Sequence, residues 1–316
     1  MPSSVAPVSR ALGIAAWASF AAQVAIIGTG GAVRLTGSGL GCPTWPTCTP
    51  DSLIPTAELS WHSAIEFGNR MMTGLLSIIA VLVLVLVWRI RRERRDLWAL
   101  GWIVLGGVIA QAIVGGITVW TGLNPFIVGF HYIASVSLVC VTAVFLFRFD
   151  TRPGARELAV PAWFAGLAHG GSGVLAVSLA MGVLTTGAGP HSGDQQVGRS
   201  GFDATLLEHI HAWPGYAFAV IALALVILSA INRMPTLQWS VLLLVLVLMQ
   251  VALGLYQART GLPPFAVGAH MVLAALVAAT MTLVVLSLKR EAVAPSPLES
   301  PESKTLASST AADEVR

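Results

Sequence analysis

The chain has 316 residues, of which 55% are apolar and only 10% are Asp, Glu, Lys or Arg, and its mean hydropathy is +0.78. A soluble domain carries about 25% charged residues, so this composition excludes a soluble globular protein and indicates a chain that lies largely in lipid. The net charge of +3 does not indicate nucleic-acid binding, because Lys and Arg gather in short runs at the ends of apolar segments, where they orient helices in a bilayer.

Apolar segments long enough to cross a bilayer recur along the whole chain. The first follows Arg10 and continues to about residue 32, which is longer than the apolar core of a cleaved signal peptide. A spanning helix needs about 20 apolar residues. The sequence therefore predicts an all-α integral membrane protein with eight transmembrane helices, at about 11–30, 65–88, 97–119, 127–147, 162–184, 206–231, 236–257 and 266–288.

The connections between these helices differ in charge. Most of the basic residues fall in four connections, at 89–95, 148–156, 232–233 and 289–290. The positive-inside rule assigns these connections and both termini to the cytoplasm. The outer connections are then at about 31–62, 120–126, 186–204 and 258–265. We expect a multi-pass protein of the cell membrane whose last residues, 291–316, form a disordered cytoplasmic tail rich in Ser, Pro, Ala and Glu.

An internal repeat divides the chain into two halves. Residues 111–131 match residues 250–270 at a constant offset of 139, and ten of the 21 positions are identical. Four helices separate the two copies, so both halves have the same orientation in the membrane, as in a parallel repeat. The sequence predicts two tandem four-helix bundles, an N-terminal half at 1–150 and a C-terminal half at 160–290.

Ionisable side chains inside spanning helices are costly and are functional candidates by default. His131 and His270 end the two copies of the repeat, near the outer ends of their helices. In the second half Glu208 and His211 are three residues apart, which puts both on one face of a helix. A bundle with inward histidines on its second and fourth helices can hold one haem iron between them.

The other histidines fit this pattern less well. A single intramembrane histidine often only bonds a neighbouring helix, so the haem interpretation depends on the recurrence of the histidine in both copies. His209 is turned ~160° away from His211 on the same helix. His169, within the fifth segment, and His191, in an outer connection, are interpreted as structural or surface residues.

Two cysteines lie close together in the first outer connection. Cys42 and Cys48 are separated by Pro-Thr-Trp-Pro-Thr, whereas Cys140 is alone in the fourth helix. Thiols on the oxidising side of a membrane favour a disulfide, and a zinc site would need further ligands nearby. The spacing is not the Cys-x-x-Cys of thioredoxin-like pairs, so redox participation stays the minor alternative.

Four arginines lie at or beyond the outer ends of the helices, namely Arg34, Arg70, Arg199 and Arg259. A haem held near this face would present two propionates, and guanidinium groups pair bidentately with carboxylates. Arg34 and Arg70, beside the Gly-rich first connection and the helix that carries Glu66, are therefore candidate propionate contacts. Arg199 and Arg259 fit contact with lipid headgroups equally well.

The combination of these features resembles the haem A synthase family. The shared features are eight helices in two halves, Glu-x-x-His on the second helix of a half, His on its fourth, and a loop cysteine pair matched here by Cys42 and Cys48. Residues 30–43, Gly-Gly-Ala-Val-Arg-Leu-Thr-Gly-Ser-Gly-Leu-Gly-Cys-Pro, look like the first outer connection of that family. The resemblance covers about residues 10–290 and implies an oxidoreductase that converts the C8 methyl of haem O to a formyl group, giving haem A for terminal oxidase assembly.

The resemblance also implies roles for individual residues. His211 and His270 would be the iron ligands of a b haem, the cofactor in the second half, and His131 would ligate the substrate haem in the first half. Glu66 matches the acidic residue that the family needs for activity. We expect this carboxylate to accept a proton, or to stabilise positive charge on the methyl carbon, during two successive oxidations through an alcohol and a hydrated aldehyde.

One position departs from the family pattern. Where many members have the first-half counterpart of His211, this chain has Asn69. Neutral Asn is a poor iron ligand, so the first-half iron is expected to be five-coordinate through His131. His62 lies on the same helical stripe as Asn69 but ~10.5 Å higher along the axis. We therefore expect His62 to meet the haem edge, a propionate or the loop.

The expected partners are haem O, the lipid bilayer, a haem O synthase that supplies the substrate, and an electron acceptor that the sequence does not identify. Nucleic acid is not expected, and an oligomer is left open. A membrane di-haem electron-transfer cytochrome is the main alternative, but it predicts bis-histidine sites in both halves, and Asn69 argues against it. A transporter would gather its polar residues at the bilayer midplane, whereas here they lie near the outer ends.

Overall fold

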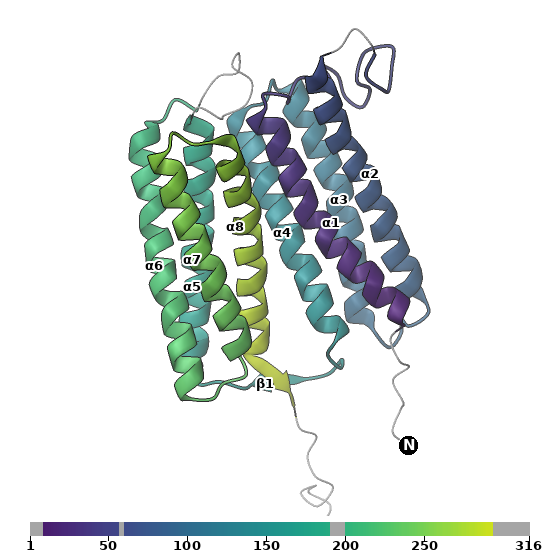
Figure 1. Ribbon diagram of the computed structural model, residues 1–316. Coiled ribbons are helices and arrows are strands. Elements are labelled where there is room, and N and C mark those ends of the chain that lie inside the picture. Colours follow the sequence, from purple (N-terminus) through teal and green to yellow (C-terminus); the bar gives the residue numbers. More distant parts are fainter. Residues whose placement is uncertain (1–8, 57–59, 190–199, 293–316) are drawn as a thin grey trace, which may run out of the picture.

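The computed structural model describes residues 9–56, 60–189 and 200–292, and within these ranges the chain forms eight long helices (Figure 1). All eight are long and apolar enough to cross a membrane, which confirms the prediction of an all-α, multi-pass membrane protein. The helices are α1 (Arg10–Leu35), α2 (Trp61–Trp88), α3 (Arg95–Trp120), α4 (Pro125–Phe149), α5 (Ala162–Ala188), α6 (Ala204–Ile231), α7 (Leu237–Arg259) and α8 (Pro264–Ser287).

The helices form two four-helix bundles in sequence, α1–α4 and α5–α8 (Figure 1). Neighbouring helices in the chain pack against each other within each bundle, and α1 and α4 of the first bundle pack against α8 of the second. The hydroxyl of Tyr132 on α4 donates a 2.8 Å hydrogen bond to the carbonyl of Met271 on α8, 139 residues away. The two bundles therefore meet along equivalent helices.

The repeated segment has the same local structure in both bundles. The turn before α4 has left-handed backbone at Gly122 and Leu123, and the turn before α8 has it at Gly261 and Leu262. A proline follows within the first turn of each helix, where its missing N–H costs no hydrogen bond. The histidine stands six residues after the first residue of each helix, His131 in α4 and His270 in α8, so the repeat places both at the same depth along their helices.

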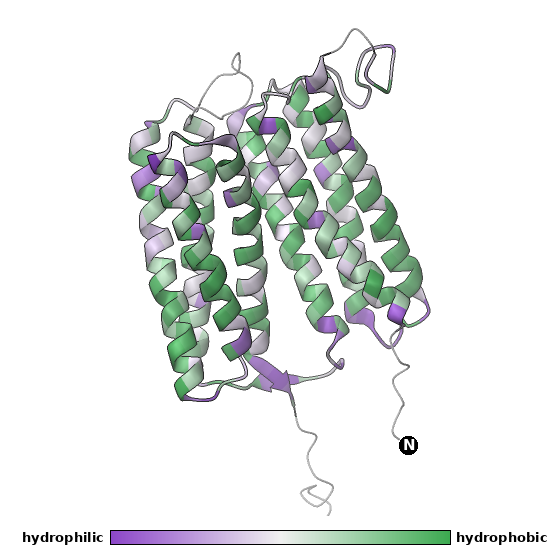
Figure 2. Ribbon diagram, in the orientation of Figure 1, coloured by the Kyte–Doolittle hydropathy of each residue, from purple (hydrophilic) through white to green (hydrophobic). Residues whose placement is uncertain are grey.

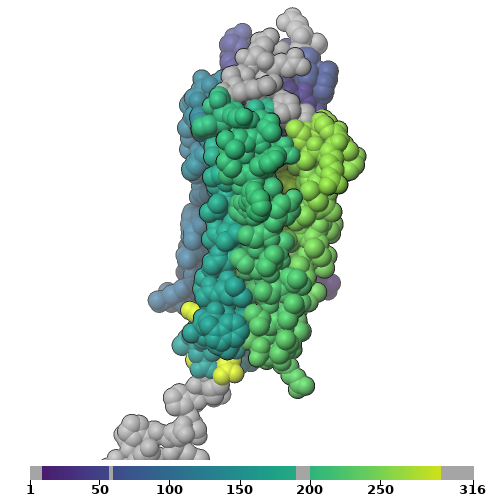
Figure 3. Space-filling view, turned by 90° about the vertical axis from the view of Figure 1, so that its left-hand side faces the viewer, coloured from purple at the N-terminus to yellow at the C-terminus, as the bar shows by residue number. Residues whose placement is uncertain are grey.

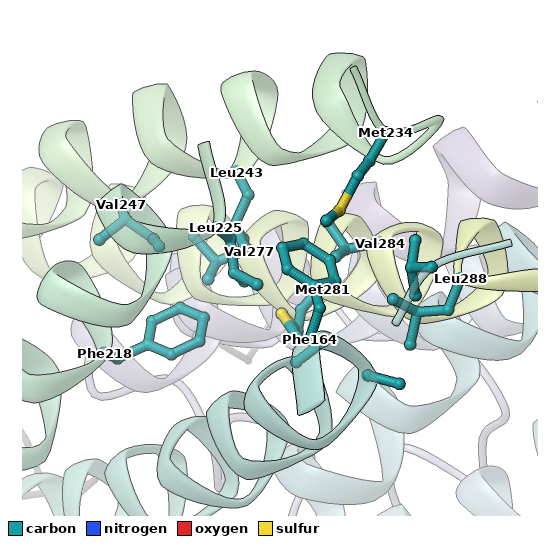
Figure 4. Close-up of a cluster of buried hydrophobic side chains, with 14 residues drawn as sticks. Phe164, Phe218, Leu225, Met234, Leu243, Val247, Val277, Met281, Val284 and Leu288 are labelled. Carbon is teal, nitrogen blue, oxygen red and sulfur yellow. The ribbon is translucent and has the colours of Figure 1, made fainter. Parts of the chain in front are cut away.

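Most residues of the helices are hydrophobic, and hydrophilic residues are most frequent at the two ends of the helices and in the connections (Figure 2). The largest buried cluster lies between the helices of the second bundle (Figure 4), where Phe164, Phe218, Leu225 and Met281 are at most 3% exposed. Outward-facing side chains are also apolar. Figure 3 looks onto α5, α6 and α7, and on α6 Trp213 is 73% exposed. Such an exterior is stable in lipid and not in water.

The two ends of the bundle pair have different character. We call the end that carries the connections at 36–60, 121–124, 189–203 and 260–263 the cysteine end, and the opposite end, with the connections at 89–94, 150–161 and 232–236, the basic end. The chain alternates between them with every helix.

A small sheet at the basic end was not predicted. Strand β1 (Arg156–Leu158) follows α4 and pairs antiparallel with β2 (Lys289–Glu291), which follows α8. Arg290 also bonds Glu157 at 2.8 Å. Two short polar segments far apart in the sequence show no strand pattern of their own, which explains why residue 291 was assigned to a disordered tail. The rest of that predicted tail, 293–316, lies outside the described residues.

Candidate functional site

Two histidines of the second bundle face each other near the cysteine end. His211 lies on α6 and His270 on α8, and their ring centroids are 6.3 Å apart with the ring planes at 78°. A metal–imidazole bond is about 2 Å long and the ring centre lies roughly 1.2 Å behind the nitrogen, so two imidazoles on opposite sides of one iron have centroids about 6.4 Å apart. The spacing of this pair therefore fits axial ligation of one haem iron.

The ring of His211 is held from behind by α5. Its Nδ1 lies 2.9 Å from the carbonyl oxygen of Ser178. Since a carbonyl can only accept, Nδ1 carries the proton and Nε2 is left with a free lone pair, which is the arrangement found for most metal-bound histidines. Gly182 allows the ring to lie against α5, because a Cβ at this position would be 2.8 Å from Cε1 of His211.

The ring of His270 is held by α7 in a way that the first bundle repeats. Gln250 donates to the carbonyl of His270 at 3.2 Å, and a Cβ on Gly254 would lie 3.2 Å from Cε1 of the same ring. In the first bundle the matching positions on α3 and α4 make the same contacts: Gln111 donates to the carbonyl of His131 at 2.8 Å, and Gly115 lies beneath its ring. The repeat therefore preserves the glutamine and glycine contacts that hold the histidine, as well as the histidine itself.

A cavity of about 350 Å³ lies between the paired histidines. Its floor includes Phe218, Val247 and Val277, which belong to the buried apolar cluster labelled in Figure 4. Glu208, one turn before His211, is exposed and lines the same cavity. A mostly apolar cavity with a few convergent polar groups is typical of a cofactor site.

The first bundle also supplies part of this cavity wall. Arg34, in the last turn of α1, lines the cavity and donates to the carbonyl of Thr186 on α5 at 3.0 Å. Because α1 continues to Leu35, beyond the predicted end near residue 30, this arginine belongs to the helix and not to the following connection. Tyr132 of α4 lines the same cavity. The cavity of the second bundle is thus completed by side chains of the first.

In the first bundle the predicted acidic residue is bound to the loop that carries the cysteines. Cys42 and Cys48 form a disulfide, as predicted, and we call residues 42–48 the cysteine loop. Glu66 of α2 is 5% exposed. One of its carboxylate oxygens accepts from the backbone N–H of Cys42 at 2.7 Å, and the other accepts from Arg70 at 2.6 Å.

Arg70 connects the helix to the loop. Besides Glu66, its guanidinium donates to the carbonyl oxygens of Cys42, Thr44 and Thr47, at 3.2, 2.9 and 3.1 Å. This set of bonds fixes the cysteine loop above the cysteine end of α2. Arg34 and Arg70, expected together as propionate contacts, therefore lie in different surroundings, since only Arg34 lines the cavity between the paired histidines.

A tryptophan of the cysteine loop covers the first bundle. Trp45 packs so closely on α3 that a Cβ at Gly116 would lie 2.5 Å from its ring, and it meets Trp120 edge to face at 5.4 Å. Gly116 directly follows Gly115, which lies against the ring of His131. The cysteine loop thus packs on α3 at the residue next to the glycine that contacts His131.

The position that corresponds to His211 in the first bundle has a different partner. The side-chain oxygen of Asn69 accepts from the hydroxyl of Thr29 on α1 at 2.7 Å. Nδ1 of His131 is buried and has no hydrogen-bond partner among the described residues. His62 lies in the first turn of α2, 2.9 Å from the hydroxyl of Ser38, so it meets the first connection, one of its three expected partners.

The remaining candidates from the sequence lie apart from the paired histidines. His209 is exposed on α6, and Arg259 is exposed at the end of α7. His169 and Cys140 line a separate cavity between the two bundles. His191 and Arg199 lie outside the described residues.

Comparisons with known proteins identify relatives of this chain. The chain is 39% identical over 134 residues to the Heme A synthase of Lysinibacillus sphaericus, which is 41% of this chain and 42% of that protein. It is 32% identical over 135 residues to the Heme A synthase of Listeria welshimeri, 41% of this chain and 43% of that protein. The chain thus matches about two fifths of the length of these curated relatives. A family model, COX15-CtaA, cytochrome oxidase assembly protein, matches residues 13–190 and 200–312. Because this match extends over nearly the whole chain, the protein belongs to the COX15-CtaA family of cytochrome oxidase assembly proteins.

Proposed function

We propose that the protein is a haem A synthase, a membrane oxidoreductase that converts the C8 methyl group of haem O to a formyl group and so supplies haem A for terminal oxidase assembly. Membership of the family and the names of the relatives, which are Heme A synthases, support this activity. The observation that carries the proposal is the asymmetry of the two bundles. One has a histidine pair spaced for a single iron, and the other has His131 with Asn69 at the position that corresponds to His211, a buried carboxylate, and a covering loop closed by a disulfide.

In this proposal the second bundle holds a b haem as a permanent cofactor, with His211 and His270 as its iron ligands. The 6.3 Å ring separation and the cavity between the rings support the assignment. A haem ligated in this way supplies one-electron redox chemistry. Arg34 is the candidate partner for a propionate, because it lines the cavity from the cysteine end. The apolar floor excludes water from beneath the cofactor, which strengthens electrostatic contacts inside the site.

The first bundle is proposed to bind haem O through His131. Asn69 bonds Thr29 and is a poor iron ligand, so the substrate iron would have one protein ligand. This suits a molecule that must enter and leave, because one bond fewer lowers its affinity for the bundle. Trp45 and the cysteine loop would exclude water from the bound substrate.

Glu66 is the proposed catalytic residue of the first bundle. It would accept a proton, or stabilise positive charge on the methyl carbon, in each of the two oxidations that lead through the alcohol and the hydrated aldehyde. Arg70 and the N–H of Cys42 act as positioning groups, because their hydrogen bonds fix both carboxylate oxygens. A fixed carboxylate needs little reorganisation during the reaction.

The proposed location is the cell membrane, with the basic end and both termini in the cytoplasm. The arginines of the α2–α3 connection support this orientation through the positive-inside rule. The two haem-handling regions would then lie near the outer face. A haem O synthase as supplier of substrate and a membrane electron acceptor complete the proposed set of partners.

Haem extraction from membranes tests the proposal. The full chain is expressed in cells that make haem O but lack haem A, and the extracted haems are quantified. We expect the wild type to accumulate haem A, and Glu66→Gln to lower it at least tenfold while b haem content is unchanged. Asp51→Asn, an exposed carboxylate at the same end, is the matched control. Normal haem A in the Glu66→Gln membranes would contradict the catalytic assignment, and b haem without any haem A in the wild type would favour an electron-transfer cytochrome.

A further inference from the structure

A separate pocket opens at the basic end of the first bundle, at the opposite end of the helices from both proposed haem sites. It has a volume of about 430 Å³ and lies where the α2–α3 connection, α3 and the end of α4 meet. We call it the basic-end pocket. The residues that line it are Arg92, Glu93, Arg95, Asp96, Leu100, Val144, Arg148, Pro153 and Gly154.

Positive charge exceeds negative charge around this pocket. Arg94 is 2% exposed and donates to both carboxylate oxygens of Asp96 at 3.1 Å. It also donates to the backbone carbonyl of Arg148, which ties the α2–α3 connection to the end of α4. Since Arg94 compensates Asp96, Glu93 is the remaining acidic residue of a lining that has three arginines.

A further guanidinium, two residues after the lining residue Gly154, has unused donors. Nε and Nη2 of Arg156, the first residue of β1, are buried without a hydrogen-bond partner among the described residues. Burial lowers the pKa of Arg156 and the positive charge of Arg148 lowers it further, while the carboxylates of Glu291 and Asp96 act in the opposite direction. Arg156 also lies over the ring of Phe147, with 5.8 Å from Cζ to the ring centroid. Buried donors and neighbouring cations of this kind are stabilised by an anion with several acceptor oxygens.

Aromatic residues mark the level of the membrane surface around this pocket. Trp88, Trp98 and Trp102 meet edge to face in succession, with centroid separations of 5.5 Å in both pairs. Trp88 is 54% exposed and Trp102 is 51% exposed, and Arg91 stacks on Trp88 at 4.0 Å. Tryptophan gathers at the headgroup level of bilayers. The arginines of the pocket therefore lie at the level of the bilayer that contains the lipid phosphate groups.

We propose that the basic-end pocket binds the phosphate headgroup of an anionic glycerophospholipid, with Arg148 and Arg156 as its principal donors. Arg95 contributes from the start of α3. The acyl chains extend from the pocket along the apolar surfaces of α3 and α4. Basic pockets between transmembrane helices bind anionic headgroups in this way, and the bound lipid joins the α2–α3 connection to the segment between the two bundles.

The experiment uses the full chain, purified in neutral detergent and stripped of lipid. Thermal unfolding is followed during titration with dioleoylphosphatidylglycerol, dioleoylphosphatidylcholine or inorganic phosphate, because a ligand that binds the folded state raises the unfolding temperature. We expect phosphatidylglycerol to bind the wild type at least tenfold more tightly than phosphatidylcholine. Equal binding of the two lipids, or equal protection by inorganic phosphate at the same concentration, would overturn the lipid assignment.

Variants connect the lipid preference to these side chains. Arg148→Gln with Arg156→Gln is expected to reduce the preference for phosphatidylglycerol to twofold or less. Arg95→Gln, at an exposed position, gives a milder test if the double variant fails to fold, with an expected three- to fivefold loss. Arg233→Gln, an exposed arginine at the basic end of the second bundle, is the matched control and keeps the full preference. A similar loss in Arg233→Gln would show that surface charge in general, and not this pocket, attracts the lipid.

Discussion

Arg70 donates a 2.6 Å hydrogen bond to Glu66, one helical turn before it, and the same guanidinium bonds three carbonyl groups of the cysteine loop. The pair therefore couples the position of the proposed catalytic carboxylate to the position of the loop. A change in either side chain is transmitted to the other.

Replacement of Arg70 by Gln is expected to lower haem A production at least tenfold and to leave the b haem unchanged. Loss of one partner of a buried ion pair costs about 3–5 kcal/mol, and the loop loses its donor. Haem extraction and protease sensitivity of the loop measure the two effects. Arg259→Gln, exposed at the same end, is the control. Normal haem A with a protease-resistant loop would show that Arg70 does not position Glu66.

Replacement of Gly182 by Ala is expected to reduce the bound b haem at least tenfold. The new methyl would lie 2.8 Å from Cε1 of His211 and 3.1 Å from its Nδ1, so the ring must move away from Ser178. Absorbance of the reduced haem per purified protein measures the loss. Gly173→Ala on the same helix, with no atom within 4 Å of the new methyl, should keep its haem. Equal haem in both variants would count against His211 as a ligand.

Replacement of Gly116 by Ala is expected to displace Trp45 and destabilise the protein by about 1–3 kcal/mol, the usual cost of overpacking. The displaced loop should also lower haem A production, because the first bundle loses its cover. Thermal unfolding and haem extraction are the measurements. Gly106→Ala, on the same helix and without neighbours within 4 Å, controls for the effect of alanine on α3. A wild-type unfolding temperature in Gly116→Ala would contradict the packing of Trp45.

Replacement of Asn69 by His is expected to make the first bundle resemble the second. The new imidazole would occupy the position that corresponds to His211 and provide a second ligand to the haem bound through His131. We expect the purified variant to retain about one additional haem per protein and to release haem A more slowly. Pigment analysis after purification measures the ratio. No gain in retained haem would argue that Asn69 and His131 do not face a shared site.

The repeat made the helix architecture and the depth of the histidines predictable. His131 and His270 recur at the constant offset of the repeat, and in the structure both are held by the same glutamine and glycine contacts. The glutamines and glycines that make these contacts were visible in the repeated motif, as Gln111 with Gly115 and Gln250 with Gly254. Their role in holding the histidines could not be predicted, because small and polar residues also recur at helix interfaces for packing alone.

The contacts between the bundles were beyond sequence reasoning. Arg34 was predicted as a propionate contact from its place beside the Gly-rich connection, and only the packing of α1 against α8 brings it to the cavity of the second bundle. The bonds of Arg70 to loop carbonyls were also hidden, since backbone acceptors have no signature in the sequence. Pairing of β1 with β2 depends on the meeting of segments more than a hundred residues apart.

The reach of Arg34 and Tyr132 into the second bundle has an evolutionary consequence. After a gene duplication, two copies can diverge freely only while each builds its own site. Here a substitution in the first copy alters a wall of the cavity in the second. The copies are therefore expected to accumulate compensating changes together. A fragment that contains only the second copy would keep its two histidines but would lack part of the wall of the cavity around them.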